Sequence, residues 1–265
     1  MATEILTFIF FLLIGLELRA GLDKPKDALL PALAALGGMI APALIFIALH
    51  HHSQAWAVAM PTDVALAVGA LSILGKRVNP SVRLFLLTLA VADDFFSLLV
   101  IAIFFRSDLN LSSAIYTLGA AAIGFILPKR DLAIKFLAPV ATFLVIPIYL
   151  WINLLSKLDF SQSGSSLSLT LIVSRVLGKV LGISLITWLI IRRGRVSLPT
   201  GLTLKEIVGV GFLAGMGLTV SIVIATITLK SSTDLSQVRI GLFFAAVVSG
   251  ALGLIWLKSG APRQD

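Results

Sequence analysis

Apolar runs of about 20 residues recur along nearly the whole chain, and they constrain the fold more than any other feature of the sequence. A helix of about 20 apolar residues is long enough to cross the hydrocarbon core of a bilayer. Hydrophobic residues make up 58% of the 265 residues and charged residues only 13%, whereas a soluble domain carries roughly 25% charged residues. We therefore expect an all-α polytopic membrane protein that forms a single membrane domain over residues 1–265 in a lipid bilayer.

Charged residues, prolines and polar clusters separate these apolar runs into nine expected transmembrane helices. The first and the fifth are short for a hydrocarbon core about 30 Å thick, so we expect them to be tilted or incomplete. The expected spans are 3–18, 28–49, 56–75, 81–105, 110–127, 136–156, 166–191, 206–229 and 237–257.

Basic residues are distributed unevenly between the loops that alternate across the membrane. One set of loops and ends carries 15 lysines and arginines, whereas the alternate set carries 4. Because cytoplasmic loops are enriched in basic residues, we expect a multi-pass protein with its C-terminus in the cytoplasm and its N-terminus on the outer face. The net charge of +8 follows from this bias, so we expect no nucleic-acid partner.

Two blocks of helices, 27–105 and 166–258, lie on either side of the polar stretch "DFSQSGSSLS" (159–168). The first block starts inside and the second starts outside, and each has a central helix with an interruption, which is the pattern of an inverted-topology repeat. Pro61 removes a backbone hydrogen bond from one central helix, and Gly215 and Gly217 lie in the middle of the other. Non-helical backbone at membrane depth is tolerated only where it is buried in protein or lines a cavity.

Charged residues lie inside several expected spans, and each costs about 2.5–3.5 kcal/mol at the centre of a bilayer. Asp93 and Asp94 are adjacent in "LAVADDFFSL" (89–98), and Asp63, Lys179 and Arg175 also lie within spans. Neighbours on a helix point about 100° apart, so one lysine cannot easily neutralise both aspartates. One paired and one free carboxylate is the simpler interpretation, with the free one as a cation or proton site. A buried pair with a purely structural role is the alternative.

The two interrupted helices would also expose partial charges of opposite sign where they cross, because a helix has a positive N-terminal end and a negative C-terminal end. We expect Asp63 to lie beside the positive ends and Lys179 beside the negative ends. No nucleophile–base pair and no phosphate-binding loop is visible in the sequence, which indicates a protein other than an enzyme.

The order of these residues resembles that of bacterial sodium/proton antiporters of the NhaA family, over nearly all of the chain. The matching segments are "FFLLIGLEL" (10–18), "LGGMIAPALI" (36–45), "PTDVALAVGALSILGKRV" (61–78), "FLLTLAVADD" (85–94), "LGKVLGISL" (177–185), "GVGFLAGMGLTVSI" (209–222) and "IGLFFAAVVSGALGLIWL" (240–257).

The resemblance implies a secondary transporter of the bacterial inner membrane, in which sodium or lithium ions and protons compete for the same carboxylates, with alternating access to the two faces. By motif, Asp94 matches the main ion ligand, and Asp93 matches its neighbour, paired with Lys179. Thr62 and Asp63 match residues of the interrupted helix that help to bind the ion. No cofactor is expected, and no metal beyond the transported sodium.

The same resemblance assigns supporting roles to other positions. Glu4 matches an aspartate that lines the cytoplasmic ion funnel of the family or a nearby cavity. Pro61, Gly215, Gly217 and Thr219 match the non-helical parts of the two interrupted helices.

The chain departs from the family in the number of its spans. The first family helix and the loop that helps to form the dimer have no match here, so a homodimer is left open, and two spans are missing after Asp108. Phe95 and Phe96 follow the aspartate pair and are expected to narrow the ion path. Three interpretations stay open: a minimal antiporter, a truncated and inactive relative, or an accessory membrane protein whose missing helices come from another chain.

Overall fold

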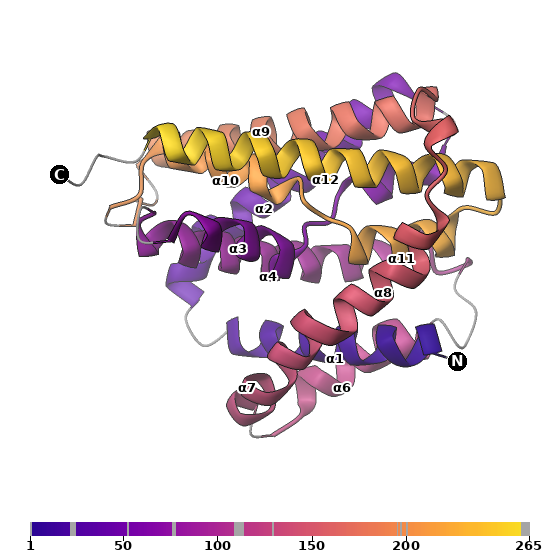
Figure 1. The fold of residues 1–265 in the computed structure, drawn as a ribbon. Helices are drawn as coiled ribbons and strands as arrows, with labels where there is room; N and C mark the ends of the chain where they lie inside the picture. The colour runs from indigo at the N-terminus through magenta and orange to yellow at the C-terminus, as the bar shows by residue number, and fades with distance from the viewer. Residues whose placement is uncertain are drawn as a thin grey trace.

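The structure is a computed structural model that describes residues 2–21, 25–51, 53–75, 78–108, 114–128, 130–194, 196, 198, 199 and 201–260. Every regular element within these ranges is helical (Figure 1). The continuous helices are α1 (Ala2–Gly21), α2 (Pro25–Leu49), α4 (Pro80–Phe104), α9 (Ser166–Arg192) and α12 (Ser232–Gly260).

Two further spans are interrupted. The first consists of the 3₁₀-helix η1 (Gln54–Ala59) and α3 (Val64–Ile73), and the second of α10 (Leu204–Ala214) and α11 (Thr219–Thr228). The remaining segments are η3 (Ile115–Gly119), α6 (Ala120–Ile126), α7 (Arg130–Val140), η4 (Ala141–Val145), α8 (Ile146–Asn153), η5 (Leu155–Lys157) and η6 (Phe160–Gln162).

In the described part of the chain, six helical segments are long and apolar enough to cross a membrane, or seven when the bent pair α10 and α11 is counted as one span. These helices confirm the prediction of an all-α multi-pass membrane protein. The expected total of nine also included α1 and the segment Ile115–Ile126. The latter is too short for the criterion, and α1 carries Glu4, Glu17 and Arg19 within its 20 residues.

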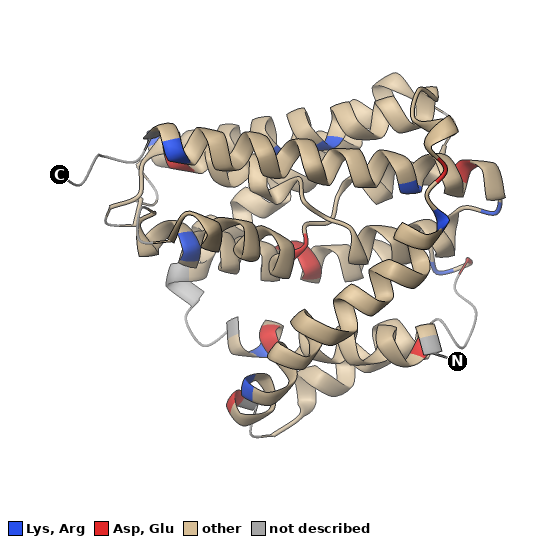
Figure 2. Ribbon diagram, viewed as in Figure 1, with Lys and Arg blue, Asp and Glu red and all other residues tan. Residues whose placement is uncertain are grey.

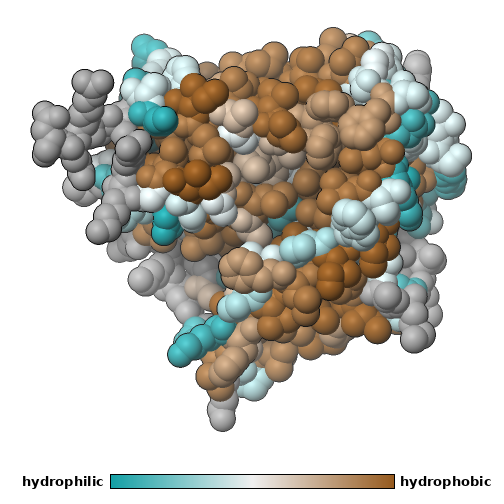
Figure 3. Space-filling view, viewed as in Figure 1, coloured by the Kyte–Doolittle hydropathy of each residue, from teal (hydrophilic) through white to brown (hydrophobic). Residues whose placement is uncertain are grey.

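The outer surface is as expected for a protein surrounded by lipid. Phe143 is 82% exposed, Ile126 78% and Ile73 75%. Figure 3 shows a broad hydrophobic face, with hydrophilic residues at its two sides and in a narrow diagonal band across it. Most charged residues lie near the ends of the helices (Figure 2). Large exposed apolar areas are rare on soluble proteins, but here they can contact acyl chains.

Around the centre of the molecule, α9 packs against α2, α10 and α12. Glycines allow this close approach, since a Cβ added at Gly182 would meet the backbone of Gly37, and one added at Gly178 would lie 2.6 Å from the Cα atom of Pro42. Small residues that bring helix backbones together are typical of membrane helices. We call α2, η1, α3, α4 and α9 to α12 the core.

A second group of helices lies along one side of the core in Figure 1 and consists of α1, η3, α6, α7, η4 and α8. Within it, α1 packs against α6, where an added Cβ at Gly15 would meet the carbonyl of Ala121. Because α1 also contacts α4, this group forms one wall of the space beside the aspartate pair. We call it the side wall.

The two predicted interruptions are confirmed, between Ala59 and Val64 and between Ala214 and Thr219. Each of the blocks 27–105 and 166–258 contains a long helix, an interrupted helix and another long helix, in that order. Their relation as an inverted repeat stays a prediction.

Candidate functional site

The interrupted segments of the core meet each other inside the molecule. The backbone N–H of Asp63 donates to the carbonyl of Met216 at 3.1 Å, and the Thr62 hydroxyl donates to the carbonyl of Ala214 at 2.9 Å. A Cβ added at Gly217 would collide with the carbonyl of Pro61. The two non-helical stretches therefore cross in direct backbone contact, and only glycine fits at position 217. We call this contact the crossing.

Asp63 lies at the positive end of α11, as expected from the sequence. Its Oδ2 accepts hydrogen bonds from the backbone N–H groups of Leu218 at 3.3 Å and Thr219 at 2.9 Å, and from the Thr219 hydroxyl at 2.8 Å. The side chain is 3% exposed. A carboxylate that binds the free N–H groups at a helix N-terminus is stabilised by both hydrogen bonds and the helix dipole.

The negative ends at the crossing are bound by Arg175. Its guanidinium Nη1 donates to the carbonyl of Val58 and Nη2 to the carbonyl of Pro61, both at 2.7 Å. On the second interrupted helix, Nε donates to the carbonyl of Gly215 at 3.4 Å and Nη1 to the Ser221 hydroxyl at 2.7 Å. The side chain is fully buried, so one cation satisfies acceptors from both broken helices.

Lys179, which the sequence analysis placed beside the negative helix ends, has other partners. Its Nζ lies 3.0 Å from Oδ2 and 3.3 Å from Oδ1 of Asp93, and it donates to the Thr62 hydroxyl at 2.9 Å. Both charged side chains are 0% exposed. The structure thus brings Lys179 together with one aspartate of the pair, as expected, whereas Arg175 takes the position expected for Lys179 at the helix ends.

Asp94 has a different environment from its neighbour Asp93. It is 4% exposed, and its Oδ1 has no hydrogen-bond partner in the described structure. It lines a cavity of about 60 Å³ together with Asp63 and Glu17. The rest of its lining is largely apolar apart from Thr142. A cavity of this size that contains three carboxyl groups has room for a water molecule or for a small, partly hydrated cation. Asp94 therefore points into the protein, towards other acidic groups, and not towards lipid.

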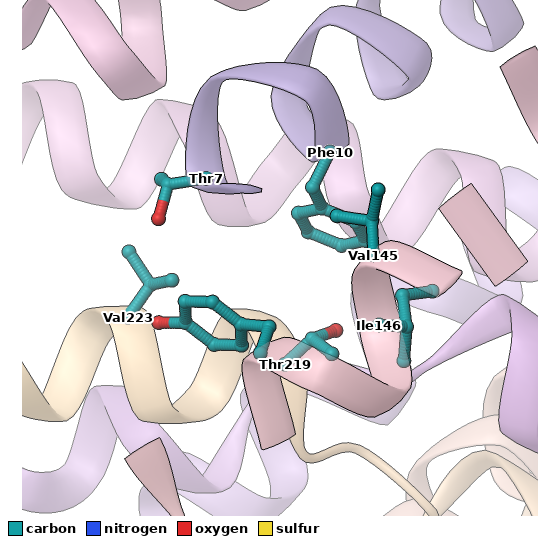
Figure 4. A pocket seen from close by; sticks show the side chains of 7 residues that line it. Thr7, Phe10, Val145, Ile146, Thr219 and Val223 are labelled. Carbon is teal, nitrogen blue, oxygen red and sulfur yellow. The ribbon is translucent and has the colours of Figure 1, made fainter. Parts of the chain in front are cut away.

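Two further cavities lie next to this one along the side wall, because neighbouring cavities share lining residues. The middle cavity measures only about 10 Å³ and shares Phe10 and Ile146 with the Asp94 cavity; Figure 4 shows Phe10, Ile146 and Thr7 around it. The outermost cavity, about 230 Å³, shares Thr7 and Tyr149 with the middle one and is also lined by Glu4. The three cavities therefore lie in a row, with the smallest in the middle.

A family model described as "Na+/H+ antiporter 1" matches residues 1–136 and 129–257 of this chain. The chain belongs to this Na+/H+ antiporter family. The resemblance seen in the motifs is thereby confirmed, and the protein is a secondary transporter and not an enzyme.

Curated relatives agree with the family assignment. The Na(+)/H(+) antiporter NhaA of Salmonella arizonae is 30% identical over 318 residues, covering 97% of this chain and 82% of the relative. The Na(+)/H(+) antiporter NhaA 1 of Klebsiella pneumoniae is 31% identical over 317 residues, covering 96% and 80%. Citrobacter koseri has a similar antiporter NhaA with 29% identity, covering 97% and 82%. These alignments are longer than the 265 residues of this chain, so this antiporter-family chain is shorter than its relatives within the aligned region.

The structure adds residues to the site that sequence reasoning missed. Glu17 and Thr142 line the Asp94 cavity. Glu17 stands in the quoted segment "FFLLIGLEL", and an acidic residue inside an apolar run was the available signal. Phe95 and Phe96, which were expected to narrow the ion path, line none of the three cavities.

The acidic groups do not form a preformed metal cluster. Within the described ranges, no three histidine, aspartate or glutamate side chains come close enough together to hold a metal ion. A cation beside Asp94 would therefore need water or hydroxyl oxygens to complete its coordination, because hard cations prefer several oxygen ligands.

Proposed function

We propose that this chain exchanges sodium or lithium ions for protons across the bacterial inner membrane, and that the cation and protons compete for Asp94. The observation that carries the proposal is the unpartnered Oδ1 of Asp94, buried in a cavity shared with Asp63 and Glu17. A buried carboxylate without a partner is costly in its charged form. Either a proton or a cation would remove that cost, and the two cannot occupy the same oxygen at once.

Asp93 and Lys179 are proposed to support the exchange as a coupled pair. Their contact at 3.0 Å lies next to Asp94 in sequence, so a positive charge arriving at Asp94 would repel the Lys179 ammonium and weaken the pair. Groups that interact this closely bind and release protons together and not as separate sites. Thr62, which accepts a hydrogen bond from Lys179, would hold the lysine in place during the cycle.

The row of three cavities supports an access route that begins near Glu4. In Figure 1 the start of α1 lies at the end of the molecule opposite the C-terminal end of α12. With the C-terminus in the cytoplasm, as the distribution of basic residues favours, the Glu4 cavity would open on the outer side and not into the cytoplasmic funnel. The narrow middle cavity would close this route in the present state. Alternating access would follow from movement of the core against the side wall.

The decisive experiment measures sodium-driven proton movement in proteoliposomes that contain only this chain. We expect exchange by the wild type, loss to background in Asp94→Asn, and retention in Asp108→Asn, a loop aspartate whose ion pair with Lys230 is long at 3.9 Å. Competition by one proton also predicts that the apparent KM for sodium rises roughly tenfold for each unit of pH below the titration range.

The same experiment tests the alternative of an inactive or accessory protein. An Asp94→Asn variant that transports like the wild type would contradict the proposed role of this residue. Absence of exchange by the wild type alone, with exchange restored by a co-purified membrane protein, would favour the accessory interpretation.

A further inference from the structure

Helix α9 places two buried cations one turn apart, and the structure gives them different partners. Arg175 contacts carbonyl and hydroxyl oxygens of both interrupted helices, whereas Lys179 contacts a carboxylate and the Thr62 hydroxyl. The family resemblance assigned a role to Lys179 alone. Two fully buried cations so close together are costly, so each is expected to have a task that the other does not perform.

We propose that Arg175 is a positioning residue for ion exchange: it fixes the two interrupted helices at the crossing, and thereby leaves Lys179 available to pair with Asp93 and to release it. This inference rests on the proposed function for the exchange itself. The attachment of Arg175 to the crossing rests only on contacts within the protein.

The chemistry of the two side chains fits this division of tasks. A guanidinium group stays charged at all ordinary pH values and has five N–H donors in a fixed plane. It suits a permanent contact with several carbonyl oxygens at helix C-terminal ends, where partial negative charge collects. An ammonium group can lose its proton when buried, which suits a partner of a carboxylate whose charge changes during transport.

The position of Arg175 links it directly to the ion site. Its partner Pro61 immediately precedes Thr62 and Asp63, the two residues that contact Lys179 and the start of α11. A Cβ added at Gly217 would collide with both the Pro61 carbonyl and Nη2 of Arg175. The guanidinium thus lies directly against the point where Pro61 and Gly217 meet. Its loss would let the Pro61–Asp63 segment move relative to Asp94.

Removal of the arginine would also change the electrostatics of the site. Among the described residues, the titratable groups that contact the crossing or line the Asp94 cavity are Asp63, Asp94 and Glu17, together with the Asp93–Lys179 pair. The spanning part of α2, residues 28–49, has no charged residue. The charged residues of α10 and α12 are Lys205, Glu206, Asp234, Arg239 and Lys258. Loss of a fixed positive charge favours the protonated form of nearby carboxyl groups, so half-maximal exchange should move to higher pH.

The test compares Arg175→Gln and Arg175→Lys with a matched control, Arg239→Gln. Arg239 is a half-buried arginine whose Nε donates to the carbonyl of Asn153 at 2.9 Å, away from the crossing. In proteoliposomes, we expect Arg175→Gln to raise the KM for sodium roughly tenfold, which corresponds to the loss of one charge-assisted hydrogen bond, and to shift the pH profile upwards. Arg175→Lys should restore the pH profile but not the KM, and Arg239→Gln should change neither.

A second readout is independent of transport. The chain has no cysteine, so Ala65→Cys, in the lining of the Asp94 cavity, provides a single thiol for a water-soluble maleimide. The labelling rate should increase severalfold when Arg175→Gln is added, and should stay constant when Arg239→Gln is added. If Arg175→Gln does not fold, Ser221→Ala removes one of the arginine's partners and should cause the same changes to a smaller degree.

The outcomes separate this inference from the proposed function. Wild-type KM, pH profile and labelling rate in a folded Arg175→Gln protein would overturn the inference, and so would a wild-type KM in Arg175→Lys. Faster labelling in Arg175→Gln, combined with no exchange by the wild type, would leave the positioning role intact and overturn the antiport proposal instead.

Discussion

The core and the side wall are built differently, although both border the Asp94 cavity. The core is joined by buried charges, with Arg175 across both interrupted helices and Lys179 on Asp93. In the side wall, 22% of an 18-residue stretch of Asp131–Lys157 is buried, against 44–56% of the corresponding stretches in the other five candidate spans. Two π-helical turns, η3 and η4, occur in this wall, and such turns weaken regular helix geometry. The comparison indicates a fixed framework on one side of the ion site and an adaptable surface on the other.

The largest loss of stability should come from breaking the buried ion pair between Lys179 and Asp93 in the core. Lys179→Ala leaves Asp93 buried and uncompensated, which costs about 3–5 kcal/mol of stability in buried pairs. We expect a large loss of folded protein in thermal denaturation in detergent. The double variant Lys179→Ala with Asp93→Asn removes both charges and should recover much of the loss. A double variant as unstable as the single one would show that the pair contributes through packing alone.

Substitutions of two glycines compare how closely the backbone is packed in the core and in the side wall. Gly217→Ala forces a Cβ against the Pro61 carbonyl in the core and should cost about 1–3 kcal/mol, as overpacking does. Gly119→Ala in the side wall places its Cβ 3.7 Å from the nearest atom, the Ala114 carbonyl oxygen, and should be neutral or stabilising by up to about 1 kcal/mol. Melting temperatures of the two purified variants provide the measurement, and equal shifts would contradict the proposed difference.

A smaller loss of stability is expected from a substitution at the small middle cavity of the side wall. Tyr149 lines this cavity and the outer one, so Tyr149→Phe removes a hydroxyl group while nearly preserving the volume. We expect a stability loss of about 0.5–1.5 kcal/mol, typical of one hydrogen-bonding group, and a change in sodium exchange rate of a few fold. Tyr116→Phe, in the outer cavity only, is the matched control. Equal exchange rates in both variants would argue against the middle cavity as the closed point of the route.

The smallest change in stability should come from a substitution at Asp159, in the loop between α8 and α9 that joins the side wall to the core. Hydrogen bonds from Ser161 hold the pKa of Asp159 below its ordinary value. Because the folded state has the lower pKa, this contribution to stability is present above the ordinary value near 3.8 and is lost as the pH falls through the folded-state pKa. The melting temperature of Asp159→Asn should therefore lie slightly below that of the wild type at pH 7 and match it under strongly acidic conditions. A difference that persists in acid would contradict this origin.

Features that depend on local sequence were predictable. Pro61 and the glycines Gly215 and Gly217 interrupt helices by their own backbone properties, and the structure has its breaks there. Asp93 and Asp94 are neighbours on one helix and so point about 100° apart. Different surroundings for the two carboxylates were therefore expected. Membrane helices follow from hydropathy, although two of the nine expected spans, 3–18 and 110–127, do not combine the length and the low charge of a single span in the structure.

Features that depend on distant contacts were not predictable. Arg175 meets Val58 and Pro61, which are 117 and 114 residues away in sequence, and nothing near it in the sequence indicates these partners. Glu17 joins the Asp94 cavity only because α1 packs against α4. The direction of the Phe95 and Phe96 rings likewise depends on the rotation of α4, which the sequence pattern left undetermined.

The bonds of one guanidinium to both interrupted helices have a mechanical consequence. Because Arg175 is fully buried, neither break can shift alone without leaving buried carbonyl oxygens without their donor. The two interrupted helices should therefore move together. Probes placed on α3 and on α11 should therefore report correlated displacements during a cycle, in the same direction and at the same moment.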